Sequence, residues 1–213
     1  MDKIKYNDFN INNIQLERDS HTYILDNDKS FEFTSVTTFI AEFFDKFDAL
    51  KIATKLVNNV PKYSKFTVDE LIGKWNEARD HGTQVHNEIE DYLIDGTKPK
   101  EKKAILGIDW LKKHTFQEEH KVYSEKIIYS KDLHLAGSID LIIQNTKTNQ
   151  YSIVDWKTNA KITTSSFKNK MGTHDITSNI EDCKYSLYAL QLSLYRYILE
   201  EFYGLNIYRQ FIV

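Results

Sequence analysis

GSIDLIIQNTKTNQYSIVDWKTN, residues Gly137 to Asn159, is the stretch that decides the fold. It holds two apolar, β-branched runs, Ile139–Ile143 and Tyr151–Trp156, on either side of the polar segment Asn145–Gln150. Two such runs joined by a short polar segment are typical of an antiparallel β-hairpin. With the turn centred between residues 147 and 148, the hairpin has a single register.

The predicted register places Asp140 directly opposite Asp155. Opposed side chains on one face have Cβ atoms about 4.5–5.5 Å apart, and Lys157 shares the face of Asp155 because strands alternate with period two. Two carboxylates this close repel unless a cation lies between them. Mg²⁺ prefers oxygen ligands. We therefore expect Asp140, Asp155 and the backbone carbonyl of Trp156 to bind a divalent metal, with Lys157 orienting or deprotonating an attacking water.

The alternative is an exposed hairpin end with a surface Asp–Lys pair. The apolar pattern of both strands favours a central, buried hairpin instead. One face is predicted to carry Ile139, Leu141, Ile143, Val154 and Trp156, and the other Ile142 and Ile153. Charged groups embedded in such a hairpin need a partner or a function.

Length and composition favour one domain over residues 1–213, with an N-terminal hairpin and helical lobe (1–80) and a catalytic core (81–213). The net charge of −3 argues against a protein that binds nucleic acid through bulk positive charge. The single cysteine, Cys183, excludes a disulfide framework and a self-contained four-cysteine site, so we expect no zinc and no iron–sulfur cluster. No apolar run is long enough for a membrane span, which predicts a cytoplasmic protein.

The first eighty residues predict supporting structure without assignable chemistry. Tyr23–Leu25 and Phe31–Phe33 alternate around a polar turn, which indicates a small hairpin. Ser35 or Thr37 is expected to cap a helix that runs through Phe39, Phe43 and Phe47. Residues 48–80 show helical spacing of apolar residues.

The stretch HGTQVHNEIEDYLIDG, residues 81–96, predicts a helix that is capped by Thr83 and ends near Gly96. His86 borders its apolar stripe and therefore points towards the edge of the core. A lone histidine at such a place is more often a hydrogen-bonded packing residue than a metal ligand. Glu90, one turn further on, is either a hydrogen-bond partner of His86 or a solvated side chain.

A helix over Lys100–His114 is predicted to precede a strand over residues 120–130, on which Tyr123, Glu125, Ile127 and Tyr129 share a face. Glu125 is the polar exception on that face, and a buried glutamate is rare unless it is paired or metal-bound. If this strand neighbours the Asp140 strand, Glu125 is a further acidic ligand or anchors one. A charge at the sheet edge paired with lysine is the alternative.

The segment after Lys157 is polar and carries Lys161, Lys168 and Lys170. Lysine, hydroxyl and amide groups are the usual phosphate contacts, so we expect this loop to grip a nucleic-acid backbone, unless it is an ordinary solvated loop. A helix follows to Gly204, with Gln191 and Tyr195 four residues apart on one face. Residues 207–213 predict a final strand.

Three motifs together resemble the PD-(D/E)XK nuclease superfamily in its RecB-like branch. They are GSID, fourteen residues and DWK; the helix motif GTQVH; and the pair Gln191 and Tyr195 as Q-x-x-x-Y. The resemblance implies a restriction-endonuclease-like α/β core, with a mixed central sheet flanked by helices. It implies that Asp140 and Asp155 bind metal with His86, that Gln191 and Tyr195 position substrate, and that a glutamate such as Glu125 belongs to the site.

The function implied by the resemblance is a Mg²⁺- or Mn²⁺-dependent DNA exonuclease in replication, recombination or repair, similar to phage, viral and mitochondrial genome-maintenance exonucleases. The expected partner is single- or double-stranded DNA, together with other replication or recombination proteins, and no membrane. The alternatives are an endonuclease of the same fold, a non-catalytic nucleic-acid-binding module, and a metal-dependent enzyme that acts on small phosphates.

Overall fold

The computed structural model describes residues 13–17, 20, 22–28, 30–115 and 119–213. Residues 1–12 of the predicted N-terminal lobe lie outside the described residues. The strands are β1 (Ile14–Glu17), β2 (Thr22–Leu25), β3 (Thr34–Ser35), β4 (His120–Ser130), β5 (Leu135–Asn145), β6 (Gln150–Asp155) and β7 (Asn206–Ile212). The α-helices are α1 (Val36–Ala41), α2 (Ala49–Asn59), α3 (Val68–Asp95), α4 (Lys102–His114) and α5 (Lys184–Tyr203).

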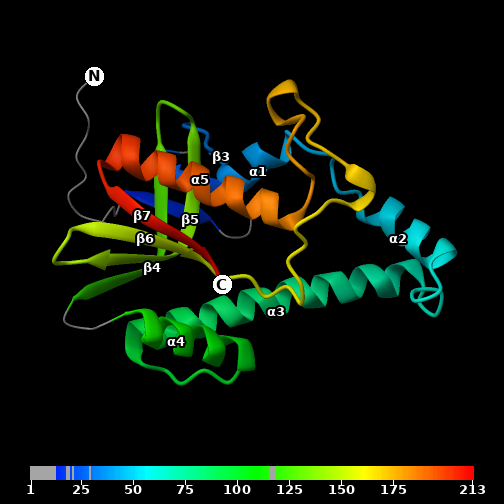
Figure 1. Cartoon of the computed structure of the whole chain (residues 1–213), viewed down its shortest axis with the longest axis horizontal. Helices are drawn as coiled ribbons and strands as arrows, with labels where there is room; N and C mark the ends of the chain where they lie inside the picture. The colour runs from blue at the N-terminus through cyan, green and yellow to red at the C-terminus, as the bar shows by residue number, and fades with distance from the viewer. Residues whose placement is uncertain (1–12, 18–19, 21, 29, 116–118) are drawn as a thin grey trace.

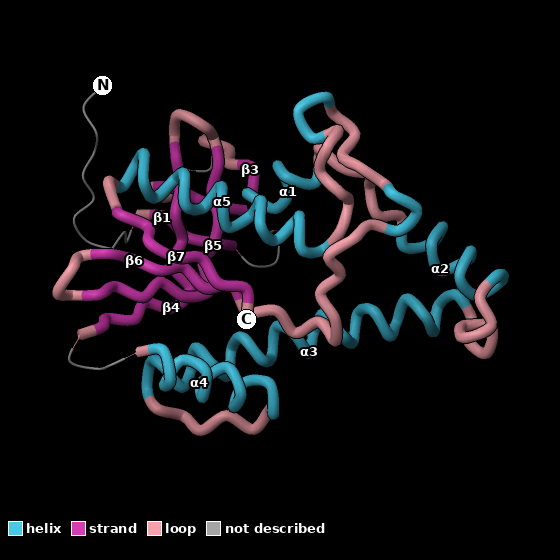
Figure 2. The backbone as a smooth tube through the Cα atoms, in the orientation of Figure 1, coloured by secondary structure: helices cyan, strands magenta, loops and turns pink. Residues whose placement is uncertain are grey.

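The central sheet is mixed, as the sequence predicts, and β5 is its most connected strand (Figures 1 and 2). β5 pairs along its length with antiparallel β4, and at its two ends with parallel β3 and antiparallel β6. β7 extends the sheet by pairing parallel to β6. Because a parallel pair needs a crossover, α5 connects β6 to β7 across one face.

Helices cover both faces of this sheet, which confirms the predicted α/β class. On one face α1 and α5 bury a cluster with Ile139, Ile142 and Ile153 of the sheet. On the other, α3 and α4 bury a second cluster with Leu141, Ile143, Val154 and Trp156. The β1–β2 hairpin packs on Tyr129 and Ala136 in a third cluster.

The β5–β6 hairpin has the register that the sequence predicts. Ile142 pairs with Ile153 and Asn145 pairs with Gln150. The pairing ends at Leu141 and Val154, so Asp140 and Asp155 lie just beyond the last pair.

The alternation of faces breaks at one point shared by β4 and β5. Ser124 pairs with Leu141 and Lys126 with Ile139, but the intervening Glu125 and Asp140 form no pair. Glu125 has a φ of 47°, a conformation that is uncommon for a side-chain-bearing residue and costs about 1–3 kcal/mol. A local break of this kind reorients the side chains on either side of it.

Two sequence predictions are wrong because of this break. Ile139 packs with Ile142 on the α5 face and not with Leu141. Tyr123 packs against the α1–α5 cluster, whereas Ile127 and Tyr129 lie under the β1–β2 hairpin, so these residues do not share one face. A strict period of two fails wherever the backbone leaves the extended region.

α3 is one continuous helix of 28 residues that passes through the boundary predicted at residue 80. Thr67 caps it and forms a reciprocal capping box with Glu70, so the cap predicted at Thr83 is wrong. Gly96 ends the helix in the left-handed conformation, as predicted. The N-terminal end of α3 and all of α2 lie away from the sheet, at one end of the molecule (Figure 1).

The N-terminal hairpin is present, but with a different partner strand. Tyr23–Leu25 pairs with β1, and Phe31–Phe33 is not a strand. Ser35 caps α1, as predicted, although the helix ends at Ala41.

The segment between β6 and α5, residues 158–183, is a long loop fixed at several points; we call it the β6–α5 loop. Near α5, Tyr188 donates a hydrogen bond to Asn159, with a distance of 2.6 Å from Oη to Oδ1. Further along, Thr173 N donates to the carbonyl of Phe43 at 2.8 Å. The loop therefore connects the sheet, α5 and the end of α1.

Gly137 and Gly73 offer a test of this packing. A Cβ at Gly137 would lie 2.5 Å from Cε1 of Tyr195, whereas one at Gly73 meets no heavy atom within 4 Å. We expect Gly137→Ala to lower the free energy of unfolding by about 1–3 kcal/mol through overpacking. We expect Gly73→Ala, within α3, to raise it by about 0.5–1 kcal/mol. Urea unfolding measures both, and equal stabilities would contradict the packing.

Candidate active site

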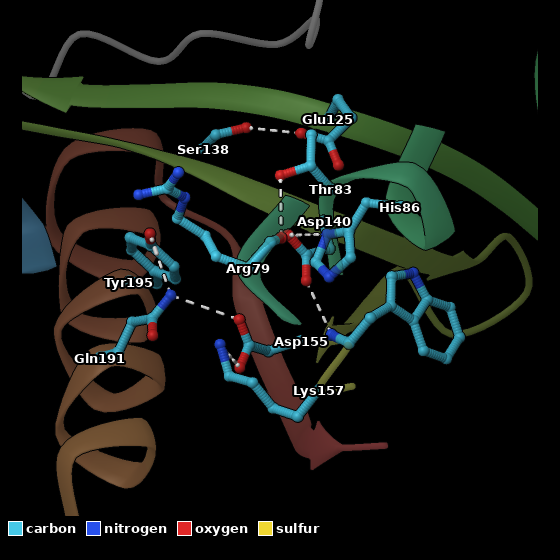
Figure 3. A network of polar contacts seen from close by, with 11 residues as sticks. Arg79, Thr83, His86, Glu125, Ser138, Asp140, Asp155, Lys157, Gln191 and Tyr195 are labelled. Atoms are coloured by element: carbon cyan, nitrogen blue, oxygen red, sulfur yellow. Dashed lines mark hydrogen bonds and ion pairs between the residues drawn. The ribbon is translucent and has the colours of Figure 1, made fainter. Parts of the chain in front are cut away.

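A cavity of ≈ 370 Å³ opens between α3, the β4–β5 pair and the start of the β6–α5 loop. Its lining includes Arg79, Thr83, His86, Glu125, Ser138 and Lys157. Figure 3 shows that the polar side chains in and around it come from α3, from β4 and β5, from the end of β6 and the residues after it, and from α5. Their convergence is a consequence of the fold.

His86, Glu125 and Asp140 bring one donor atom each to a common point, with all three atoms within 4.8 Å of one another. His86 Nδ1 lies 3.5 Å from Asp140 Oδ1 (Figure 3). Ser138 Oγ donates to Glu125 Oε2 at 3.1 Å. Two residues of this group, Glu125 and Asp140, are the ones that form no pair between β4 and β5.

The second oxygen of Asp140 accepts a hydrogen bond from the backbone N–H of Trp156, with 2.7 Å between Oδ2 and N. This bond ties the end of β5 to the end of β6, beyond their last ladder pair. It uses the N–H of Trp156, whereas the sequence predicted the carbonyl of Trp156 as a metal ligand.

Asp155 and Lys157 form a second group beside the first. Lys157 Nζ lies 2.7 Å from Asp155 Oδ2, and both side chains are largely buried. Gln191 Nε2 donates to Asp155 Oδ1 at 3.3 Å, and the same nitrogen lies 3.3 Å from the hydroxyl of Tyr195. Of the α5 pair predicted from sequence, Gln191 therefore contacts Asp155 directly and Tyr195 contacts Gln191. Asp155 is not one of the three residues whose donor atoms lie within 4.8 Å of one another.

Several acidic groups share this buried region. Burial, followed by the charge of Asp140, raises the pKa of Glu125 to about 7. The same two causes raise the pKa of Asp155, although Lys157 opposes them. Burial lowers the pKa of His86, but the hydrogen bond and charge of Asp140 outweigh it and raise the pKa. Burial is thus the main cause of the raised pKa values of Glu125 and Asp155, and the charge of Asp140 adds to it.

The group of His86, Glu125 and Asp140 fits a divalent cation. Two carboxylates and an imidazole are a donor set that suits Mg²⁺, Mn²⁺ and related ions. A cation there would favour the ionised Glu125 carboxylate, which burial and the charge of Asp140 disfavour. Asp155 lies close enough to Asp140 for the charge of Asp140 to raise the Asp155 pKa. When ionised, Asp155 adds to the attraction that this region exerts on a cation.

The other predicted site residues lie in different places. Lys161 and Lys168 are exposed on the β6–α5 loop. Lys170 Nζ is paired with Asp45 Oδ2 at 2.6 Å and fastens that loop to the segment after α1. Glu90 lies near enough to Glu125 for its charge to raise the Glu125 pKa.

The sequence did not single out Arg79 or Tyr188. Arg79 lines the cavity, and it lies seven residues before His86, on the same helical face. Lys157 Nζ lies 4.3 Å from the centre of the Tyr188 ring, and Tyr188 precedes Gln191 by one helical turn. Extending the α3 stripe by two turns before His86 and the α5 stripe by one turn before Gln191 would have found both.

A comparison with protein-family models gives a match over residues 63–206, which is more than half of the chain, to the PD-(D/E)XK nuclease superfamily. The chain belongs to the PD-(D/E)XK nuclease superfamily. The match includes α3, the β5–β6 hairpin and α5, and so covers the group of His86, Glu125 and Asp140 and the Asp155–Lys157 pair. No match was found among curated proteins or among solved structures.

Membership of the PD-(D/E)XK superfamily agrees with the mixed sheet flanked by helices, which is restriction-endonuclease-like. It indicates a nuclease, and these nucleases generally use divalent metals and bind nucleic acid. Among the described residues, no helix is both long and apolar enough to cross a bilayer.

Glu125 should make the stability of the metal-free protein depend on pH. Because its pKa rises from 4.5 to about 7 on folding, the folded chain keeps a proton that the unfolded chain releases within this window. The free energy of unfolding in chelator should therefore fall as pH increases from about 4.5 to 7. Glu125→Gln should remove part of that fall. Denaturant unfolding at both ends of the window measures the difference.

The exposed Glu77 of α3 provides the control, because Glu77→Gln should follow the wild type. Mn²⁺ should raise the unfolding temperature more at the upper end of the window, where ionised ligands bind it better. The same pH dependence of stability in Glu125→Gln and wild type would contradict the raised pKa of Glu125.

Proposed function

We propose that this protein is a Mg²⁺- or Mn²⁺-dependent deoxyribonuclease of the RecB-like branch that hydrolyses phosphodiester bonds as an exonuclease. The sequence motifs GSID, DWK, GTQVH and Q-x-x-x-Y support the branch. The preference for exonuclease over endonuclease action rests on similarity to phage, viral and mitochondrial exonucleases. In this proposal the protein acts inside the cell in DNA replication, recombination or repair, together with other proteins of those processes.

One observation carries the proposal: a histidine and two carboxylates meet within 4.8 Å, beside a buried Asp155–Lys157 pair. In this proposal His86, Glu125 and Asp140 hold the metal, and Asp155 completes the acidic environment. A bound Mg²⁺ or Mn²⁺ lowers the pKa of water and polarises the phosphoryl group.

Lys157 is proposed to act on the reacting phosphate. Its ammonium is held by Asp155 on one side and by the ring of Tyr188 on the other. A cation with so little freedom orients the attacking water and offsets the negative charge that grows on the phosphate oxygens.

Gln191 and Tyr195 are proposed to keep Asp155 in place and to border the substrate. The Gln191 amide reaches both Asp155 and the Tyr195 hydroxyl. Lys161 and Lys168, on the exposed part of the β6–α5 loop, are proposed phosphate contacts. Lys170 is proposed to act indirectly, because its ion pair with Asp45 positions that loop.

Lys157→Ala should retain metal binding and lose most turnover, by about 100-fold or more. The measurement is a time course on end-labelled single- and double-stranded DNA with Mg²⁺, Mn²⁺ or chelator. Release of mononucleotides from the ends supports an exonuclease, and internal fragments would indicate an endonuclease instead.

Two comparisons make this test specific. The exposed lysine variant Lys121→Ala should keep the wild-type rate. Asp155→Asn should lose hydrolysis while keeping DNA binding, which a non-catalytic binding module would not display. A near wild-type rate for Lys157→Ala would remove Lys157 from the mechanism, and activity on mononucleotide esters alone would overturn the DNA assignment.

A further inference from the structure

The segment before α3 is basic in a chain whose net charge is −3. Residues 49–68, ALKIATKLVNNVPKYSKFTV, contain four lysines and no aspartate or glutamate. The lysines are Lys51, Lys55, Lys62 and Lys65, and all four are exposed. α2 and its connection to α3 therefore carry positive charge, flanked by Asp48 before the stretch and by Asp69 and Glu70 after it.

Aromatic rings alternate with these cations. Lys62 Nζ lies 5.3 Å from the centre of the Tyr63 ring. Lys65 and Lys74 each lie 5.1 Å from the centre of the Phe66 ring. Cations beside stacking surfaces are the combination with which proteins bind single-stranded nucleic acid.

A stripe on α3 connects this region to the catalytic cavity. Trp75 and Arg79 precede His86 by eleven and seven residues, so all three lie on one side of the helix. Arg79 lines the cavity. Trp75 packs edge-on against Phe47 at 5.7 Å between ring centres, and Phe47 is 70% exposed. Arg79 and the Trp75–Phe47 pair therefore lie between the basic segment and the catalytic cavity.

We propose that this surface is a track for single-stranded DNA that runs from the catalytic cavity to the far end of α3. It comprises Arg79, Trp75 and Phe47, followed by the tip formed by Lys62, Tyr63, Lys65, Phe66 and Lys74. Phosphates contact the lysines and Arg79, while unpaired bases stack on the rings. The inference rests on the proposed function, because the bound strand is the one that is cleaved.

The length of the track follows from helix geometry. His86 and Val68 are eighteen residues apart in α3, which is about 27 Å at about 1.5 Å per residue. A stacked strand advances about 3.4 Å per nucleotide, so the tip contacts DNA about eight nucleotides from the metal site. Shorter strands cannot reach both ends.

The test is binding of oligothymidylates of about four, eight and sixteen nucleotides, measured by fluorescence anisotropy in EDTA over a series of salt concentrations. The double variant Lys62→Ala/Lys65→Ala should weaken binding of the longest oligomer by about 25-fold at 0.1 M salt, about fivefold for each phosphate contact. Its logarithmic salt slope should become shallower by about 1.4. Binding of the shortest oligomer, which can occupy either end of the track but not both, should weaken less than that of the longest.

Lys112→Ala/Lys113→Ala on α4 is the matched control. It removes the same charge, and Lys112 also lies 5.1 Å from an aromatic ring centre, that of Tyr92. This control should bind all lengths like the wild type. Phe47→Ala should weaken binding of the longer oligomers by about fivefold or more while leaving the salt slope unchanged. Thermal unfolding establishes that each variant is folded.

The outcomes separate this inference from the proposed function. Wild-type affinity of Lys62→Ala/Lys65→Ala for the longest oligomer, or equal losses in the α4 control, would overturn the track. Duplex DNA that binds as tightly as a single strand, with no effect of Phe47→Ala, would overturn it as well. Tip-dependent binding without hydrolysis in Mn²⁺ would instead overturn the nuclease assignment and leave the track standing.

Discussion

The missing pair between Glu125 and Asp140 is the constraint on which the site depends. In an uninterrupted ladder these carboxylates would sit opposite each other on one face, with their neighbours alternating regularly. The positive φ of Glu125 breaks that alternation. As a result Ile139 and Ile142 both face α5, while Glu125 and Asp140 meet His86 from α3. The strained backbone of β4 is thus located at a candidate metal ligand, Glu125, where strain is commonly found.

The sheet also separates two kinds of polar contact. On the α3 side, two carboxylates converge with a histidine, and burial together with the charge of Asp140 raises the pKa of Glu125. On the α5 side, Asp155 is balanced by Lys157 and Gln191. A bond from the Trp156 N–H to Asp140 links the two. The group of His86, Glu125 and Asp140 therefore attracts a metal cation, and the adjacent group contains the Lys157 ammonium. Two positive charges placed in this way are suited to binding an anion between them.

Much of this could be predicted from the sequence. The β5–β6 register follows from the turn position and from two apolar faces, since a slip by one residue would expose the core. The Glu125 conformation could not be predicted, because no glycine or asparagine marks it. Thr83 suggested the start of a helix, but α3 begins at Val68, after the Thr67 cap, and is continuous there. For this reason the sequence did not predict that Arg79 and Trp75 share a helix with His86.

Val213 gives the site a particular place in the order of folding. Its N–H donates to the carbonyl of Asp155, and its carbonyl accepts from the N–H of Lys157. The DWK backbone is therefore completed by a strand that arrives only after α5 has crossed the sheet. During synthesis the acidic residues of the site therefore precede the strand that fixes the DWK backbone, so this part of the site can form only after β7 has paired with β6.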